Sequence, residues 1–323
     1  MSGLTFVDVC AGAGGLALGL ERAGFEPTLL LDEDADACRT LRANRPHWKV
    51  LQADLLDLDP SEHPESYDVD LLSAGLPRVK SSATSARAGS SEEEKLLRAS
   101  IYLAHAVRPR ALVIENVPTL VDPNGFRDFH DFARAELEHL GYEFSWFLLN
   151  AADFGVPQDR KQGVLVAIKK QWFQAFRPPS PIVTEHMPVG EALAPSMRSR
   201  GWKDADRWAA QAITVAPTLV GGSKNRGGAD LGPTGSKRKW EKLGVNAHSL
   251  GDEIPGADFT WDPEIGREGL VKITVDQTAL LQGFPESWEI TGRKTARYRQ
   301  IGHASPPPVG EAIGRAVARA LRS

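Results

Sequence analysis

Apolar runs alternate with amphipathic segments along the first half of the chain. Continuous apolar runs separated by helices are typical of a parallel sheet that is covered on both faces. The pattern therefore predicts a doubly wound α/β domain. We expect strands at residues 5–9, 27–34, 49–55, 68–75, 111–117, 144–151 and 163–169, and helices at 15–23, 35–44 and 92–107.

The character of the sequence changes near residue 171. Residues 171–271 are rich in Pro, Gly, Lys, Arg and Trp and contain few strand-like runs, which indicates a second, irregular domain. Regular order returns at KITVDQTALLQGFP, and the chain closes on a helix, VGEAIGRAVARALR. Apolar residues recur every four positions in this helix, so one face should pack onto the first domain. They are Val309, Ile313, Val317 and Leu321.

Composition narrows the class of protein. The formal net charge of −4 argues against a protein that coats nucleic acid by bulk charge, but it leaves room for a cleft with a local basic face. Two cysteines, Cys10 and Cys38, are too few for a disulfide framework or a cysteine-rich metal site, and we expect no metal. The sequence shows no membrane-spanning run and no secretion signal, so we expect a cytoplasmic protein.

The first strand runs into a glycine-rich turn, CAGAGG, followed by a helix. Gly12, Gly14 and Gly15 would let the backbone approach a ligand at the carboxyl end of the sheet. The turn lacks the third glycine spacing of the dinucleotide fingerprint. Taken alone, it is equally consistent with a tight βα turn that binds nothing.

The next two strands each end at a carboxylate. Asp32 ends the second strand, where it can accept both hydroxyls of a ribose, and Asp54 ends the third, within reach of an adenine amino group. A pyrophosphate cofactor would prefer helix N-termini and positive charge. The pattern therefore favours S-adenosylmethionine over NAD.

These segments, taken in order, resemble the motifs of the DNA (cytosine-5) methyltransferase family. VDVCAGAGGLALGLERAGF resembles the first motif, ALVIENV the E-N-V motif, and FGVPQDRKQGVLVAI the Q-x-R-x-R motif. ITVDQTALLQGFPESW resembles the motif that frames the recognition domain, and KTARYRQIGHASPPPVGEAIG the last motif. The resemblance extends from about residue 5 to residue 320.

The resemblance implies a Rossmann-like, S-adenosylmethionine-dependent methyltransferase domain made of residues 1–171 and 272–323. Residues 172–271 would form a smaller target-recognition domain. Duplex DNA would bind between the two, with the target cytosine flipped out of the helix.

The resemblance also implies roles for individual residues. The family's nucleophile is the cysteine of G-P-P-C-Q, and the corresponding loop here reads G-L-P-R-V, which places Arg78 at the nucleophile position and Val79 at the glutamine. Glu115 would bond the N3/N4 edge of the base. Arg160 matches the first arginine of Q-x-R-x-R, and Gln162 replaces the second, which would hold the base O2.

Two further sets of contacts follow from the resemblance. In the first motif Cys10 replaces an aromatic residue that would stack on the adenine. The basic segment GGSKNRGGADLGPTGSKRKW would read a DNA groove, with a solvated basic loop as the alternative. Cofactor contacts are expected from Asp8, Cys10, Ala11, Gly12, Gly14, Gly15, Leu16, Asp32, Glu33, Asp54, Leu55, His303 and Ser305, and DNA contacts from Ser223, Lys224, Arg226, Lys237, Arg238 and Gln282.

Three functions remain open at this point. The first is methyl transfer to cytosine, including transfer to an exocyclic nitrogen without a covalent adduct. The second is a catalytically silent protein that binds S-adenosylmethionine and DNA beside a partner, such as an active methyltransferase or a restriction endonuclease. The third is a nicotinamide-dependent oxidoreductase on a similar sheet, against which the IENV motif and the small domain argue.

Overall fold

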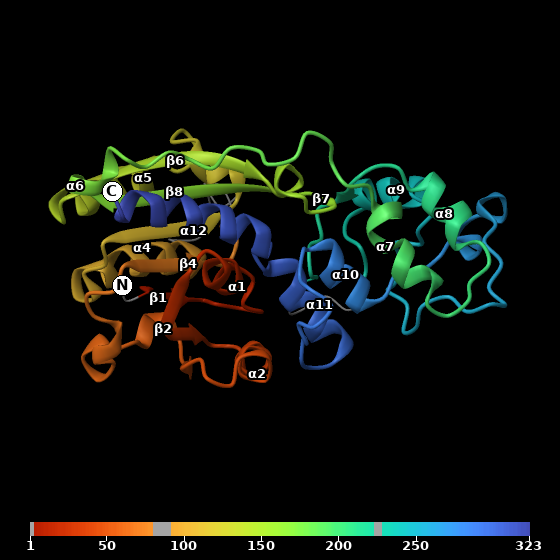
Figure 1. Ribbon diagram of the computed structural model, residues 1–323, viewed down its shortest axis with the longest axis horizontal. Coiled ribbons are helices and arrows are strands. Elements are labelled where there is room, and N and C mark those ends of the chain that lie inside the picture. Colours follow the sequence, from red (N-terminus) through yellow and green to blue (C-terminus); the bar gives the residue numbers. More distant parts are fainter. Residues whose placement is uncertain (1–2, 80–91, 223–227) are drawn as a thin grey trace. The chain divides into compact units, whose positions relative to one another are not determined.

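The computed structural model describes residues 3–79, 92–222 and 228–323. The chain forms two compact units (Figure 1): residues 1–149, 161–180 and 309–323 make the first, and residues 150–160 and 181–308 the second. The second unit thus includes 272–308, which the expected functional division assigns to the first domain. The reason is local packing, since the Gln277 side chain donates a hydrogen bond to Ser196 Oγ at 3.0 Å.

All seven predicted strands form one sheet in the order β3-β2-β1-β4-β5-β8-β6. The fold is therefore the predicted α/β class. The carboxyl ends of β1, β2, β3, β4 and β5 share one edge because these strands are parallel. Their bounds are β1 (Leu4–Val9), β2 (Phe25–Asp32), β3 (Val50–Gln52), β4 (Leu71–Gly75), β5 (Ala111–Asn116), β6 (Tyr142–Asn150) and β8 (Lys161–Lys169).

Strand β8 corrects the expectation of a purely parallel sheet. It runs antiparallel to β5, with Glu115 opposite Val164 and Asn116 opposite Gly163. Parallel neighbours need a crossover of a dozen or more residues, usually a helix. Only the short segment 151–160 joins β6 to β8, so β8 returns in the opposite direction.

The helices of the first unit are α1 (Gly15–Arg22), α2 (Ala35–Asn44), α4 (Glu92–Val107), α5 (Arg127–His139), α6 (Lys170–Phe173) and α12 (Pro307–Leu321). Four of them, α1, α2, α4 and α12, begin and end close to the predicted positions, whereas α5 and α6 were not predicted. The side chain of Asp34 caps α2 by accepting a hydrogen bond from Asp36 N at 2.8 Å. The four predicted apolar residues of α12 are buried, which confirms its packing face.

Glycine lets α12 approach α1 closely. A Cβ added at Gly314 would lie 2.7 Å from Ala23 Cβ, so no larger residue fits there without a shift.

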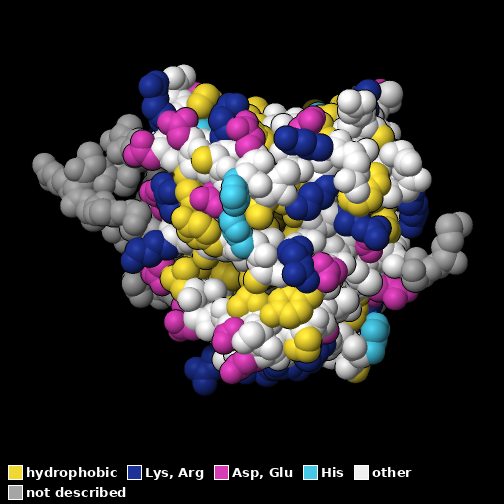
Figure 2. Space-filling model, turned by 90° about the vertical axis from the view of Figure 1, so that its left-hand side faces the viewer, with side chains coloured by type: hydrophobic (Ala, Val, Ile, Leu, Met, Phe, Trp, Pro, Cys, Tyr) yellow, Lys and Arg dark blue, Asp and Glu magenta, His cyan; other side chains and the backbone are white. Residues whose placement is uncertain are grey.

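On the face of the molecule shown in Figure 2, basic and acidic side chains are interspersed with hydrophobic ones, so this face carries no single sign of charge.

Helices are the main regular elements of the second unit, which has a tryptophan core. Trp208 and Trp261 are buried, and their indole N–H groups donate to Leu243 O at 3.0 Å and Gly244 O at 3.2 Å. The unit contains α7 (Val189–Arg198), α8 (Ala205–Gln211), α9 (Thr234–Lys242), α10 (Val275–Leu281) and α11 (Lys294–His303), with the short parallel pair β7 (Gln158–Asp159) and β9 (Ala216–Pro217).

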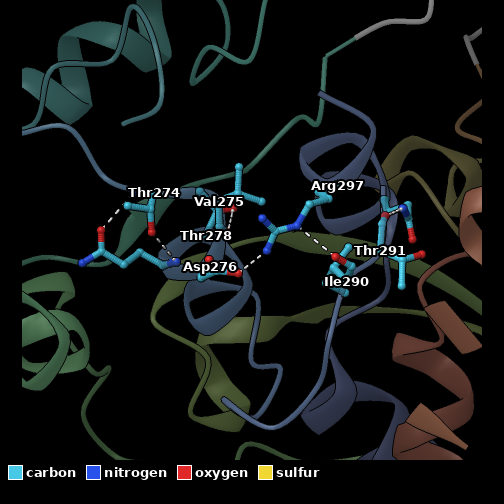
Figure 3. Close-up of polar contacts among 9 residues, drawn as sticks. Thr274, Val275, Asp276, Thr278, Ile290, Thr291 and Arg297 are labelled. Carbon is cyan, nitrogen blue, oxygen red and sulfur yellow. Dashed lines mark hydrogen bonds and ion pairs between the residues drawn. The ribbon is translucent and has the colours of Figure 1, made fainter. Parts of the chain in front are cut away.

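Polar contacts connect α10 to α11 and to the segment between them (Figure 3). Thr274 and Gln277 form a capping box at the start of α10. Arg297 of α11 pairs with Asp276 and donates to Ile290 O at 2.9 Å. These bonds hold the segment after α10 in place.

Short 3-10 helices occupy several connections. They are η1 (Leu55–Asp57), η2 (Pro60–Glu62), η3 (Pro64–Ser66), η4 (Pro118–Val121), η5 (Ala151–Phe154), η6 (Pro263–Ile265) and η7 (Arg267–Gly269). Within the ranges that the structure describes, no helix has both the length and the apolar character needed to cross a bilayer.

Candidate functional site

The glycine turn after β1 is tied to the end of β2. Gly12 has a φ of 55°, and a Cβ there would meet nothing within 4 Å, so the backbone conformation and not crowding favours glycine. Gly12 N donates to Asp32 Oδ2 at 2.7 Å, and Asp34 N donates to Asp32 Oδ1 at 2.8 Å. Each oxygen keeps a second lone pair. The Asp32 carboxylate can therefore position the turn and still accept a ligand hydroxyl.

Acidic groups gather around this turn. Asp54 lies at the start of η1, where its Oδ1 accepts from Leu56 N at 2.9 Å. Burial raises the pKa of the Cys10 thiol, and the negative charges of Asp32, Asp8, Glu33 and Asp54 raise it further. Burial also raises the pKa of Cys38, to about 11. Both thiols are therefore protonated at neutral pH.

Asp8 is a buried carboxyl group on β1. It lies opposite Ser73 of β4, and the two side chains are hydrogen bonded at 2.5 Å between Ser73 Oγ and Asp8 Oδ1. Burial raises the Asp8 pKa to about 7, the bond to Ser73 lowers it, and the charge of Asp32 raises it. Asp8 therefore changes protonation state near neutral pH.

The loop after β4 is fixed by the side chain of Asn116. Asn116 Oδ1 accepts from Val79 N at 3.1 Å, and its Nδ2 donates to Pro77 O at 3.0 Å. These bonds hold the backbone on both sides of Arg78, which is exposed. Gly75, at the root of the loop, lies opposite Glu115 on β5. The structure thus brings the Arg78 loop and Glu115 together.

Gln162 lies on the same face of the sheet as Glu115. Glu115 pairs with Val164, and Gln162 is two residues from Val164 along β8, so it is a diagonal neighbour of Glu115. Glycine is required at position 163, between Gln162 and Val164, because the backbone of Val117 approaches closely: a Cβ on Gly163 would lie 2.5 Å from Val117 O. Both Glu115 and Gln162 are buried.

Arg160, Gln282, His303 and Ser305 belong to the second unit. The buried Arg160 donates from Nη1 to Leu219 O at 3.1 Å. Gln282 is also fully buried: its Nε2 donates to Ala304 O at 2.5 Å and its Oε1 accepts from Gln158 Nε2 at 2.7 Å. A DNA contact by the Gln282 side chain would require these bonds to break, so its place in the structure is that of an internal support.

The remaining expected DNA contacts divide into two groups. Lys237 of α9 pairs with Asp230 at 2.7 Å, while the neighbouring Arg238 is exposed. Trp240 anchors the same helix in the core. Ser223, Lys224 and Arg226 lie outside the described residues.

Comparison with known protein families shows to which family the chain belongs. The family model for C-5 cytosine-specific DNA methylases matches residues 4–319. The chain belongs to this family. Members of the C-5 cytosine-specific DNA methylase family use S-adenosylmethionine as the methyl donor, so the cofactor expected from the strand ends is that of the family.

Curated relatives match along the whole chain. The Type II methyltransferase M.NaeI of Lentzea aerocolonigenes is 43% identical over 99% of this chain and 76% of its own length. The Type II methyltransferase M.NgoMIV of Neisseria gonorrhoeae is 37% identical over 98% of both chains. These relatives associate the chain with DNA methylation and restriction-modification.

Solved structures have the same fold at low sequence identity. The S. pombe Dnmt2 methyltransferase superposes with a TM-score of 0.64 at 16% identity, covering 99% of this chain and 98% of its own. The Entamoeba histolytica methyltransferase EhMeth gives a TM-score of 0.68 at 11% identity, covering 100% of both chains. The fold is that of a methyltransferase.

The family's cofactor fits the residues present. Asp8, Asp32, Glu33 and Asp54 give the turn a negative field that suits a cationic sulfonium ligand. Asp8 Oδ2 is buried and has no hydrogen-bond partner among the described residues. Sequence reasoning missed Asn116 and Ser73 as site residues. Asn116 directly follows Glu115 in the recognised motif, which was a usable signal, whereas the role of Ser73 depends on strand pairing.

Proposed function

We propose that this protein binds S-adenosylmethionine at the glycine turn and duplex DNA through its second unit, with a cytosine flipped out toward Glu115. The observation that carries the proposal is the meeting of the Asn116-held loop with Glu115 at the carboxyl ends of β4 and β5. Asp32 and Asp54 would hold the ribose and the adenine. When bound, the cofactor supplies the methyl group.

The covalent route to C5 lacks its nucleophile. That route needs a thiolate that adds to C6 of the base. Arg78 stands at the tip of the loop, is permanently charged and cannot add to C6. The chain's two cysteines have raised thiol pKa values. We therefore propose that the protein forms no C6 adduct, and that the Arg78 guanidinium binds a phosphate or a base acceptor.

Methyl transfer without an adduct is the second candidate function. It is favoured by the 43% identity to a Type II methyltransferase over 99% of the chain. An exocyclic nitrogen can attack the methyl group directly, and Glu115 would hold the N3/N4 edge of the base. If no methyl group is transferred, the protein binds DNA and cofactor as the silent member of a pair, with an active methyltransferase or a restriction endonuclease as partner.

Trapping with fluorinated DNA tests the proposal. Duplex genomic fragments carrying 5-fluorocytosine should form no covalent complex with the wild-type protein. Arg78→Cys, combined with Val79→Gln and Gln162→Arg, should form one, because Glu115 and the Asn116-held backbone remain. Arg127→Cys, at an exposed position on α5, is the matched control and should form none.

The same DNA, incubated with labelled S-adenosylmethionine, distinguishes methyl transfer without an adduct from silent binding. Label on an exocyclic nitrogen supports non-covalent transfer, and absence of label supports the silent binding protein. Adduct formation by the wild type would contradict the proposal, because it would require an unrecognised nucleophile. A folded, DNA-binding triple variant that forms no adduct would contradict the assignment of the loop.

A further inference from the structure

Asp8 has an unusual environment for a carboxyl group. The residue is 0% exposed and lies on β1, an interior strand of the sheet. The glycine-rich turn begins two residues later, at Cys10. Its Oδ1 contacts Ser73 Oγ, and its Oδ2 has no hydrogen-bond partner in the described part of the chain. A buried carboxylate without full hydrogen bonding is costly, whereas a neutral carboxyl group is tolerated.

The local hydrogen bonds fit a protonated Asp8. Ser73 Oγ lies 2.5 Å from Asp8 Oδ1 and 3.2 Å from Val7 O, yet the hydroxyl has only one hydrogen. If Asp8 carries a proton, it donates to Ser73 Oγ, and Ser73 donates to Val7 O. Both contacts are then satisfied. The Asp8 pKa of about 7 agrees with a neutral group at slightly acidic pH.

The charged neighbours of Asp8 are acidic. Asp32, at the end of β2, raises the Asp8 pKa directly. Cys10 lies two residues further along the chain. Besides burial, the charges of Asp32, Asp8, Glu33 and Asp54 raise the pKa of its thiol, so all four carboxyl groups act on the same turn. On β4 the facing group is the Ser73 hydroxyl. A positive charge at this turn would therefore favour the ionised form of Asp8.

We propose that Asp8 releases its proton when a cationic ligand binds at the glycine turn, so that the site selects the sulfonium form of the cofactor over its neutral thioether product. The inference rests on the proposed S-adenosylmethionine site and adds a residue that determines its specificity. Asp8 acts through its charge on the ligand. The proton released on binding goes to the buffer. Asp8 takes a proton back from the buffer once methyl transfer has left the neutral thioether in the site.

Calorimetry with the two ligands tests this inference. The affinities for S-adenosylmethionine and S-adenosylhomocysteine are measured across about pH 5.5–8.5. Their amino and carboxyl groups are common, so titration of these groups largely cancels in the ratio of affinities. The ratio should rise about tenfold per pH unit below the Asp8 pKa and level off above it, with about one proton released by the sulfonium ligand alone at low pH.

Substitutions assign the effect to Asp8. Asp8→Asn should make the affinity ratio independent of pH, while Asp57→Asn, at an exposed position on η1, should leave the wild-type profile. Ser73→Ala should move the rise to higher pH, because the Ser73 bond lowers the Asp8 pKa. Should Asp8→Asn fail to fold, the wild-type profile and the Ser73→Ala shift decide the question.

Each outcome has a distinct meaning. A ratio that does not change with pH in the wild type overturns the role of Asp8 while leaving the cofactor site intact. A pH-dependent ratio that persists in folded Asp8→Asn overturns it as well. Failure of the wild type to bind either ligand instead removes the proposed cofactor site, and with it the basis of the inference.

Discussion

Removing the Asn116 side chain should destabilise the protein by about 3–5 kcal/mol. In Asn116→Ala the two shorter bonds to the loop, from Val79 N and to Pro77 O, are lost at about 1 kcal/mol each, together with the longer contact from Nδ2 to Leu76 O at 3.4 Å. Val79 is buried, so its orphaned N–H adds about 1–3 kcal/mol more. The bond from Val117 N to Asn116 Oδ1 at 2.9 Å is lost as well, but that N–H is only partly buried.

Urea unfolding measures the loss, and amide hydrogen exchange at Val79 shows whether the loop is released before global unfolding. Asn116→Asp keeps the acceptor oxygen for Val79 N but replaces the Nδ2 donor with a second carboxylate oxygen that faces Pro77 O, so Val79 should stay protected although stability still falls. The matched control is Asn124→Ala, whose exposed amide bonds only to its neighbour Asp122 among the contacts described, with an expected change within about 0.5 kcal/mol. A loss below about 1 kcal/mol for Asn116→Ala would refute the account of the loop.

Two further predictions concern the helices. Gly314→Ala should lower the free energy of unfolding by about 1–2 kcal/mol in urea titrations, because Ala23 Cβ cannot move away. The control Gly235→Ala, which has open space in α9, should raise the free energy of unfolding by up to about 1 kcal/mol. No change in stability for Gly314→Ala would contradict the close packing of α12 on α1. If the exposed basic face of α9 contacts DNA, Arg238→Ala and Lys239→Ala should each reduce the slope of log affinity against log salt by about 1, measured by gel shift or anisotropy, with Arg319→Ala on α12 as the unaffected control. Unchanged slopes for both α9 variants would exclude this face.

The first unit could be predicted well because its signals are local. Helices α2 and α4 have the predicted bounds, since apolar periodicity marks both in the sequence, and a capping aspartate, Asp34, precedes α2. The direction of β8 could not be predicted in this way. A buried strand has the same continuous apolar run whether it is parallel or antiparallel to its neighbour, and the connection to β6 decides between them.

The candidate site was predictable at the strand ends and less so elsewhere. Asp32 ends β2, and Asp54 follows the last residue of β3 by two positions, so both positions follow from the strand pattern although the third strand ends earlier than predicted. The internal hydrogen bonds of Gln282 depend on Gln158, a residue more than a hundred positions earlier, and no local pattern indicates that contact. Burial of Gln282 is therefore a tertiary property that the motif alone does not reveal.

The residue at position 78 can change without disturbing the scaffold that presents it. Asn116 binds backbone atoms of Pro77 and Val79, so the position of the loop does not depend on the side chain between them. Successive residues of a strand face opposite sides, which leaves Glu115 on the face it shares with Gln162 while Asn116 holds the loop. The base-facing function proposed for Glu115 and the loop-holding contacts of Asn116 thus belong to adjacent residues of β5, and neither requires a thiol. An arginine at position 78 is compatible with an intact fold, which is why the cysteine substitution can test the chemistry separately from the structure.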